Sequence, residues 1–189
     1  EQTFTITVNP VNDAPTFSKG ANVTVLEDSG AKSIPNWPTN IKPGPTDESG
    51  QQLNFVTSND NTSLFSVQPE ISADGTLTFT PGPDFNGSAK VTVQLHDDGG
   101  TADGGNDTSV SQTFTIAVTA VNDPPSFTLA SDAVVVSNTL LTTIPNFAYD
   151  ITKGPPDETS QTVTFVVTND NNAFFAGQFQ PAITSTGTL

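Results

Sequence analysis

The chain has 189 residues, and its 20 acidic against 5 basic side chains give a formal net charge of −15 at pH 7. Nucleic acid and anionic membranes are therefore excluded as expected partners, because both require a basic face. The sequence has no cysteine, which excludes disulfides, zinc–thiolate sites and thiol nucleophiles. Its apolar runs all fall short of the roughly 18 residues of a membrane-spanning helix, so we expect no membrane insertion.

A long internal repeat organises the chain. The segment QTFTITVNPVNDAPTF, residues 2–17, returns as QTFTIAVTAVNDPPSF, residues 112–127, at a spacing of 110 residues. Self-similarity over such a length indicates tandem modules. We therefore predict the terminal strand of a preceding module at residues 1–12, a complete module at 13–122, and a second, C-terminally truncated module at 123–189. Since no signal-peptide pattern opens the sequence, we expect it to be a piece of a longer protein.

Short segments that alternate between apolar and polar residues follow one another along the modules. In chain order, their apolar members are Phe4, Ile6 and Val8; Leu53 and Phe55; Leu77 and Phe79; Val91, Val93 and Leu95; and Phe114, Ile116 and Val118. A period of two, bounded by Gly, Pro, Asn and Asp, is typical of half-buried antiparallel strands. About seven such strands in roughly 110 residues predict an all-β fold of tandem immunoglobulin-like sandwiches.

Acidic and amide side chains gather in the loops and at the module ends. They are Asn12, Asp13, Glu27, Asp28, Asp47, Glu48, Asp84, Asn86, Asp97, Asp98, Asn122, Asp123, Asp157 and Glu158. Asp and Asn are ordinary turn residues, and this explanation suffices for any single pair. Their recurrence at module boundaries, in a chain with so few basic residues to neutralise them, favours a cation site instead. Calcium takes about six to eight oxygen ligands of these types.

Other candidate sites give weaker signals. The Gly- and Asp-rich loop at residues 99–107 has only a faint likeness to the calcium-binding repeat of RTX proteins, and a mobile hairpin loop explains it better. His96 continues an alternating strand and no nucleophile accompanies it, so we expect a solvated side chain and no enzyme activity. Trp37 matches Phe147 in the repeat, which favours a core or shoulder position over a sugar-stacking platform.

The module boundaries resemble a known family. VNDAPTF and VNDPPSF resemble the DxNDNxPxF linker of cadherin repeats, and more closely the bacterial cadherin-like tandem repeats of large surface and RTX-type adhesins. The resemblance covers nearly the whole chain, with VNDAP, EDS, TDE, DGTLTFTP, PDFNG and DDGG in order. It implies immunoglobulin/cadherin-like, seven-stranded Greek-key sandwiches. It also implies calcium at each junction, bound by first-strand, mid-domain, linker and following-domain residues.

Two sets of calcium ligands follow from this resemblance. At the junction inside the chain they are Glu27, Asp84 with Asn86, Asn122, Asp123, and Asp157 with Glu158; at the upstream junction they are Asn12, Asp13, Asp47, Glu48 and one of Asp97 or Asp98. Asn86 stands where cadherins have a second acid, and Ser137-Asn138 replace Glu27-Asp28 in the second module. Fewer carboxylates imply weak binding, at about 10⁻⁴–10⁻³ M.

The resemblance predicts a calcium-stiffened structural extender of a large extracellular adhesin or cell-surface fibre, whose partners are neighbouring modules of the same chain. Opposed carboxylates repel without metal, whereas calcium bridges them. Two alternatives stay open. One is an adhesive module that binds a glycan or a partner protein through the loops near residues 97–107. The other is a filament subunit that associates head to tail by strand exchange, because residues 3–8 nearly copy residues 113–118.

Overall fold

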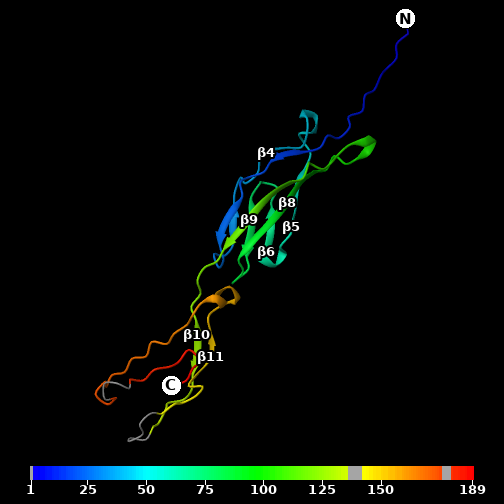
Figure 1. Cartoon of the computed structure of the whole chain (residues 1–189). Coiled ribbons are helices and arrows are strands. Elements are labelled where there is room, and N and C mark those ends of the chain that lie inside the picture. The colour runs from blue at the N-terminus through cyan, green and yellow to red at the C-terminus, as the bar shows by residue number, and fades with distance from the viewer. Residues whose placement is uncertain (1, 136–141, 176–179) are drawn as a thin grey trace. The chain divides into compact units, whose positions relative to one another are not determined.

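A computed structural model describes residues 2–135, 142–175 and 180–189 of the chain (Figure 1). The chain divides into two compact units, Glu1–Val121 and Asn122–Leu189. The described residues form strands and short 3-10 turns but no α-helix. In particular, none of them belongs to a helix with the length and apolar character needed to cross a membrane.

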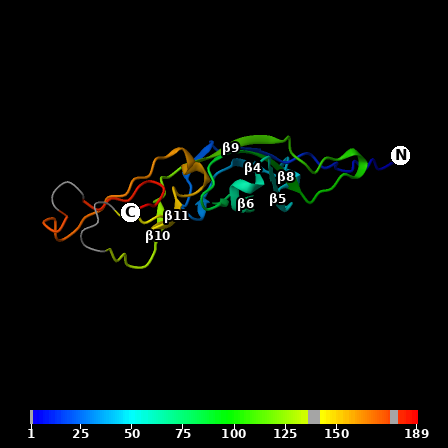
Figure 2. The ribbon, with the colours of Figure 1, turned by 60° about the horizontal axis from the view of Figure 1, so that its bottom comes forward.

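Unit 1 contains nine strands in three sheets. They are β1 (Thr16–Ser18), β2 (Val23–Leu26), β3 (Lys32–Ile34), β4 (Thr39–Lys42), β5 (Leu53–Asn59), β6 (Phe65–Ile71), β7 (Leu77–Pro81), β8 (Gly87–Asp97) and β9 (Gln112–Thr119). A four-stranded sheet has the order β2-β9-β8-β5, a three-stranded sheet the order β3-β7-β6, and β1 pairs with β4. Figures 1 and 2 both show β9, β8 and β5 in this unit. The all-β, immunoglobulin-like sandwich is confirmed here.

The core lies between these sheets and follows the alternation of the strands. In β8, Val91, Val93 and Leu95 all have 0% exposure, as their spacing predicts. They join one buried cluster with Leu77 and Phe79 of the opposing sheet. Burial of such a side chain stabilises the folded state by about 1.5–3 kcal/mol, so a core of this size holds the unit together without disulfides.

Trp37 belongs to this core, as predicted from the repeat. Its side chain is 6% exposed, and its ring centroid lies 4.2 Å from that of Phe114. Its indole N–H donates to the Ala21 carbonyl at 3.1 Å, which satisfies the ring's only polar atom. Gly20 is required beside it, because a Cβ at that position would lie 2.4 Å from the Trp37 carbonyl oxygen.

The first strand of unit 1 is divided into two, which accounts for one of the strands beyond the seven that the resemblance implies. β1 pairs antiparallel with β4, whereas β2 pairs in parallel with β9. The two halves therefore lie in different sheets, and the residues between them, including Gly20, carry the chain from one to the other. β2 is an edge strand whose one neighbour is β9.

The segment predicted as the terminal strand of a preceding module, residues 1–12, is described from residue 2 onward. Residues 2–15 are described without strand structure, and Phe4, Ile6 and Val8 are 75–86% exposed. Their counterparts in β9, by contrast, are 0–3% exposed. The reason is pairing, since a strand needs a neighbour to satisfy its backbone groups, and these residues have no strand beside them in unit 1.

Unit 2 has two described strands, β10 (Ser126–Leu129) and β11 (Ala148–Thr152), which pair antiparallel. They match β1 and β4 of unit 1. Residues 161–169 match β5 in the repeat but form no strand. The apolar face is correspondingly open, with Phe127 51% exposed against 7% for its counterpart Phe17.

Candidate metal centre

Asn12 anchors the chain where it enters unit 1. Its side-chain N–H donates to Asp97 Oδ1 and to the Asn106 carbonyl, both at 2.9 Å. The Asn106 N–H returns a bond of 2.9 Å to the Asn12 carbonyl. The loop between β8 and β9 thus holds the entering segment, and the two lie side by side in Figures 1 and 2.

Gln51 completes the environment of Asn12. Its Nε2 donates to Asn12 Oδ1 at 2.7 Å, so both polar atoms of the Asn12 amide are used. Gly99 makes this contact possible, because a Cβ there would lie 1.8 Å from the same Oδ1. The orientation of Asn12 is therefore fixed by unit 1 itself.

A 3-10 turn, η1 (Thr46–Glu48), brings Glu48 to the same end of the unit. Pro45 precedes the turn with φ −60°, and its carbonyl oxygen accepts the Glu48 N–H at 3.1 Å. The φ angle that the proline ring fixes favours the beginning of a helical turn. Glu48 is 7% exposed, and its Oε1 accepts the Asp13 N–H at 2.8 Å. Gly44 leaves the space for its other oxygen, since a Cβ there would lie 1.7 Å from Oε2.

Three buried oxygens at this end have no hydrogen-bond donor: Glu48 Oε2, Asp97 Oδ2 and Gln51 Oε1. Glu48 and Asp97 are more than nine-tenths buried, at 7% and 9% exposure, and the donors to their other oxygens are neutral N–H groups. A buried carboxylate without a compensating charge is costly. Because all the free atoms are oxygens, this donor set suits a hard cation such as calcium.

The exposed acids of the predicted upstream set lie outside this buried group. Asp13 and Asp47 are exposed, and Asp13 contributes its backbone N–H to Glu48. Asp98 is also exposed, and its Oδ1 accepts the Gln52 N–H at 2.8 Å. Of the two predicted alternatives, Asp97 is thus the one that meets Asn12.

Glu27 forms a second acidic position, at the other end of unit 1. It follows β2 and is 1% exposed. Its Oε1 accepts the Val121 N–H at 2.6 Å, and the Asn86 side chain donates to its Oε2 at a longer 3.4 Å. Asp28 Oδ1 accepts the Asp84 N–H at 3.2 Å. The predicted residues of this end that belong to unit 1 are therefore brought together.

Unit 2 repeats the construction found at the start of unit 1. The Asp123 N–H donates to Glu158 Oε1 at 3.0 Å, and Gln161 Nε2 donates to Asn122 Oδ1 at 2.9 Å. Glu158 is 5% exposed, whereas Asp157 is exposed. It lies in η4 (Pro156–Ser160), the counterpart of η1. The same arrangement is therefore built twice, 110 residues apart.

Unit 1 does not assemble a metal site from its own carboxylates. Among its described side chains taken alone, no three carboxylates place their oxygens within 4.8 Å of one another. Calcium needs about six to eight ligands, which is more than the carboxylates gathered at either end of the unit. Sequence reasoning missed Gln51 and Asn106 as members of these ends, and it placed Asp28 at the right end without including it in the ligand set. The recurrence of Gln51 as Gln161 could have identified the first.

The lysines do not supply the missing positive charge through the contacts they make. Lys19, Lys32 and Lys153 donate to the backbone carbonyls of Gly20, Ser29 and Thr159.

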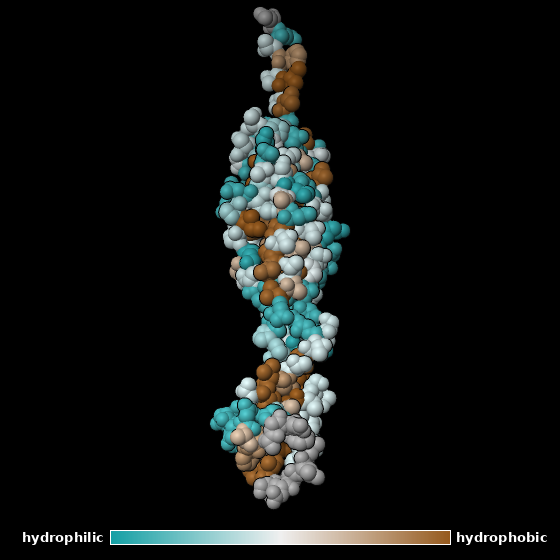
Figure 3. All heavy atoms as spheres, turned by 60° about the vertical axis from the view of Figure 1, so that its left-hand side comes forward, coloured by the Kyte–Doolittle hydropathy of each residue, from teal (hydrophilic) through white to brown (hydrophobic). Residues whose placement is uncertain are grey.

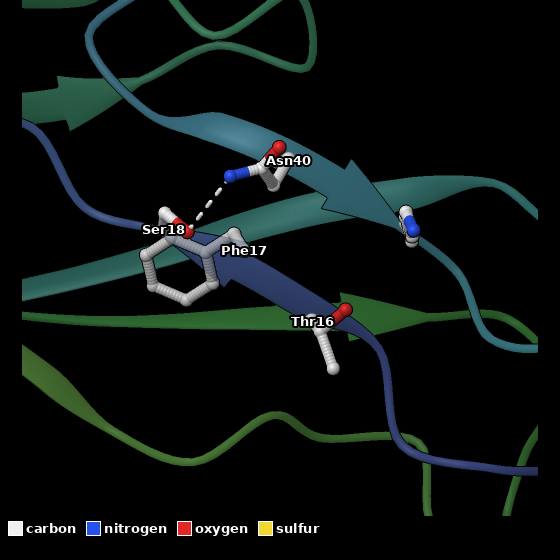
Figure 4. A pocket seen from close by; sticks show the side chains of 5 residues that line it. Thr16, Phe17, Ser18 and Asn40 are labelled. Atoms are coloured by element: carbon white, nitrogen blue, oxygen red, sulfur yellow. Dashed lines mark hydrogen bonds between the residues drawn. The ribbon is translucent and has the colours of Figure 1, made fainter.

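A shallow pocket beside β1 and β4 is lined by Thr16, Phe17, Ser18, Asn40 and Lys42 (Figure 4). It contains no carboxylate, and Asn40 donates to Ser18 Oγ across it at 3.2 Å. The pocket is therefore separate from the candidate metal ends.

Comparison with known proteins gives one family. A family model described as bacterial Ig domain matches residues 12–108, from Asn12 at the entry of unit 1 into the loop between β8 and β9. A comparison with curated proteins found no match.

Proposed function

The chain belongs to the bacterial Ig domain family, and on this premise we propose that it is an extender module of a surface adhesin or fibre, stiffened by calcium at its module ends. Domains of this family are common in surface proteins and are typically structural, non-enzymatic modules. The burial of Glu48 and Asp97, each with an oxygen that lacks a donor, is the observation that carries the calcium part of the proposal.

The types of ligand atom at these ends indicate which metal would bind. Carboxylate, amide and carbonyl oxygens are ligands for hard cations, whereas zinc and copper sites use histidine or cysteine. The chain has no cysteine and one histidine, and His96 Nδ1 interacts with Thr108 Oγ1 at 3.1 Å. Calcium tolerates an irregular arrangement of ligands better than magnesium does, which favours calcium.

Stiffening follows from where the ligands sit in the chain. Asn12 and Asp13 belong to the segment that enters the sandwich, whereas Glu48 and Asp97 belong to its body. Glu48 accepts the Asp13 N–H and Asp97 accepts the Asn12 side-chain N–H, so a cation held by Glu48 and Asp97 would fix the direction in which the chain enters the module. Because unit 1 supplies only part of a coordination sphere, the remaining ligands would come from the neighbouring module of the array.

The resemblance of VNDAP and VNDPP to cadherin-like linkers supports the same proposal and an extracellular or cell-surface location. Weak sites, at about 10⁻⁴–10⁻³ M, are typical of extracellular calcium modules. The partner of each module is then its neighbour in the array.

The proposal is tested by measuring the melting temperature and the small-angle scattering of the chain with calcium, with magnesium and with chelator. A cation that binds only the folded state raises its stability by mass action, so we expect calcium to raise the melting temperature and to increase the particle's maximum dimension. Magnesium is the matched control and should do less. Identical results in calcium and chelator would contradict the proposal.

A further inference from the structure

The amide side chain of Asn12 is held in one orientation. Its Nδ2 donates to Asp97 Oδ1 and to the Asn106 carbonyl oxygen, both at 2.9 Å. An ionised carboxylate and a carbonyl oxygen accept hydrogen bonds but cannot donate them, so the nitrogen of the Asn12 amide must face these two atoms. Its oxygen, Oδ1, is therefore turned toward Gln51.

This orientation of Asn12 determines that of Gln51. Because Asn12 Oδ1 can only accept, Gln51 must present its Nε2 to it, and this atom donates at 2.7 Å. Gln51 is also held by its backbone N–H, which donates to the Glu48 carbonyl at 3.0 Å. The remaining atom of the Gln51 amide, Oε1, is buried without a hydrogen-bond donor. The charge of Asp97 thus fixes, through two amides, which atom of Gln51 is left without a partner.

We propose that Gln51 Oε1 is a calcium ligand and that Asn12 is a positioning residue that orients it. This inference rests on the proposed function, and it changes the ligand set that the resemblance implies, in which Asn12 binds calcium and Gln51 has no role. Both polar atoms of the Asn12 amide have hydrogen-bond partners, whereas Gln51 Oε1, Glu48 Oε2 and Asp97 Oδ2 have no donor. Hydrogen bonds that orient the ligands are a regular feature of metal sites.

The atoms without donors favour a cation over a neutral partner. Glu48 and Asp97 are 7% and 9% exposed, and buried carboxylates are unfavourable unless a positive charge accompanies them. Calcium accepts carboxylate and amide oxygens alike, so it suits both kinds of atom at this end of unit 1. In Figure 3, hydrophilic and intermediate residues cover most of the visible face of unit 1 below the N-terminal segment. A hydrated cation would therefore approach through polar surroundings.

Unit 2 repeats the contacts of this glutamine. Gln161 Nε2 donates to Asn122 Oδ1 at 2.9 Å, and the Gln161 N–H donates to the Glu158 carbonyl at 3.0 Å. These bonds are the counterparts of the two that Gln51 makes, 110 residues earlier. The orientation of the glutamine is therefore a property of the repeat and not of one loop in unit 1.

Gly99 offers a way to break the contact between the two amides without removing a proposed ligand. A Cβ at this position would lie 1.8 Å from Asn12 Oδ1 and 2.4 Å from Gln51 Nε2, so Gly99→Ala should disrupt their hydrogen bond. Gly50→Ala is the matched control, because a Cβ there meets no atom within 4 Å. We expect Gly99→Ala to lower calcium affinity at least about tenfold and Gly50→Ala to leave it unchanged, as measured by calorimetric titration.

NMR of the unmodified chain tests the two assigned roles directly. A metal ion polarises the carbonyl group that it binds, so calcium should shift the side-chain carbonyl carbon of Gln51 more than that of Asn12. The neighbouring Gln52, whose side chain is exposed, is the internal control and should not respond. Gln51→Met should lower calcium affinity at least about tenfold relative to Gln52→Met.

The outcomes separate this inference from the proposed function. If the chain binds calcium but the carbonyl carbon of Gln51 shifts no more than that of Asn12, the inference is wrong and the proposed function stands. Equal calcium affinities of the Gly99→Ala and Gly50→Ala chains would also overturn it. A chain that binds no calcium would contradict the proposed function itself. Melting in chelator verifies that the variants fold, and the titration of the unmodified chain decides if Gly99→Ala does not.

Discussion

The backbone N–H of Asp13 donates to one oxygen of Glu48 at 2.8 Å, while the other oxygen of Glu48 is buried without a donor. The Glu48 carboxylate thus binds the backbone N–H where the chain enters unit 1, and its second oxygen is buried without a hydrogen-bond donor. The equivalent bond between Asp123 and Glu158 in unit 2 indicates that this is a property of the repeat.

Glu48→Gln removes the negative charge of this side chain and keeps its shape, so it tests the two contributions separately. The amide retains an acceptor for Asp13 but removes the buried negative charge, whose burial is unfavourable without a cation. We expect calcium affinity to fall at least about tenfold, which is about 1.4 kcal/mol, with no loss of melting temperature in chelator. Calorimetric titration measures the affinity. Asp47→Asn, at an exposed neighbour, is the control, and an equal loss of affinity there would show that bulk charge attracts the metal.

Glu27 should matter for folding even in the absence of metal. Glu27→Ala leaves the Val121 N–H without its 2.6 Å acceptor, and an unsatisfied polar group costs about 1–3 kcal/mol. Urea unfolding in chelator measures this loss. Glu70→Ala, at an exposed position of β6, should change stability much less. If the two substitutions were equivalent, the buried contacts of Glu27 would not stabilise unit 1.

The repeat offers the same side chain in two environments. Ile116 is 0% exposed and Ile6, its repeat partner, is 75% exposed. Ile116→Ala should lower the free energy of unfolding of unit 1 by about 2–5 kcal/mol because it opens a cavity. Ile6→Ala should change it by less than about 0.5 kcal/mol. Urea unfolding makes the comparison. Similar losses would mean that residues 2–8 pack on unit 1.

The carboxyl group of Asp74 should titrate with a pKa below that of an ordinary aspartate. Hydrogen bonds from Ser72 and Thr76 lower the pKa of Asp74 below its ordinary value. A depressed folded-state pKa contributes stability above the unfolded pKa, and this contribution is lost as the pH falls through the folded one. Ser72→Ala should raise the pKa of Asp74, measured by NMR titration, whereas Ser66→Ala should leave it unchanged. A pKa that did not respond to Ser72→Ala would assign the shift to Thr76.

Alternation along the strands predicted which side chains are buried better than it predicted which strands pair. Val91, Val93 and Leu95 are buried because a period of two fixes which face they share. The division of the first strand into β1 and β2 depends instead on pairing with β4 and β9. Such partners lie far away in the sequence, and alternation within a segment carries no information about them.

The sequence predicted which residues lie at the acidic ends of the units, but it did not predict which contacts their side chains make. The spacing of 110 residues identified Asn12 and Asn122 with their neighbouring acids. It did not show that Glu48 is buried while Asp47 is exposed, because the η1 turn decides which side chain points inward. Residues 3–8 show the converse limit: their sequence is that of a strand, but no partner lies beside them.

The parallel pairing of β2 with β9 determines how unit 1 responds to tension along the chain. The chain enters the unit before β2 and leaves it after β9, and the two strands run in the same direction. Pulling the entry and the exit apart therefore slides one strand along the other. The pairs from Val23 with Ile116 to Leu26 with Thr119 are then loaded together in shear, rather than being opened one at a time. Because these pairs must break together, we expect unit 1 to resist tension better than a unit whose strand pairs separate one after another.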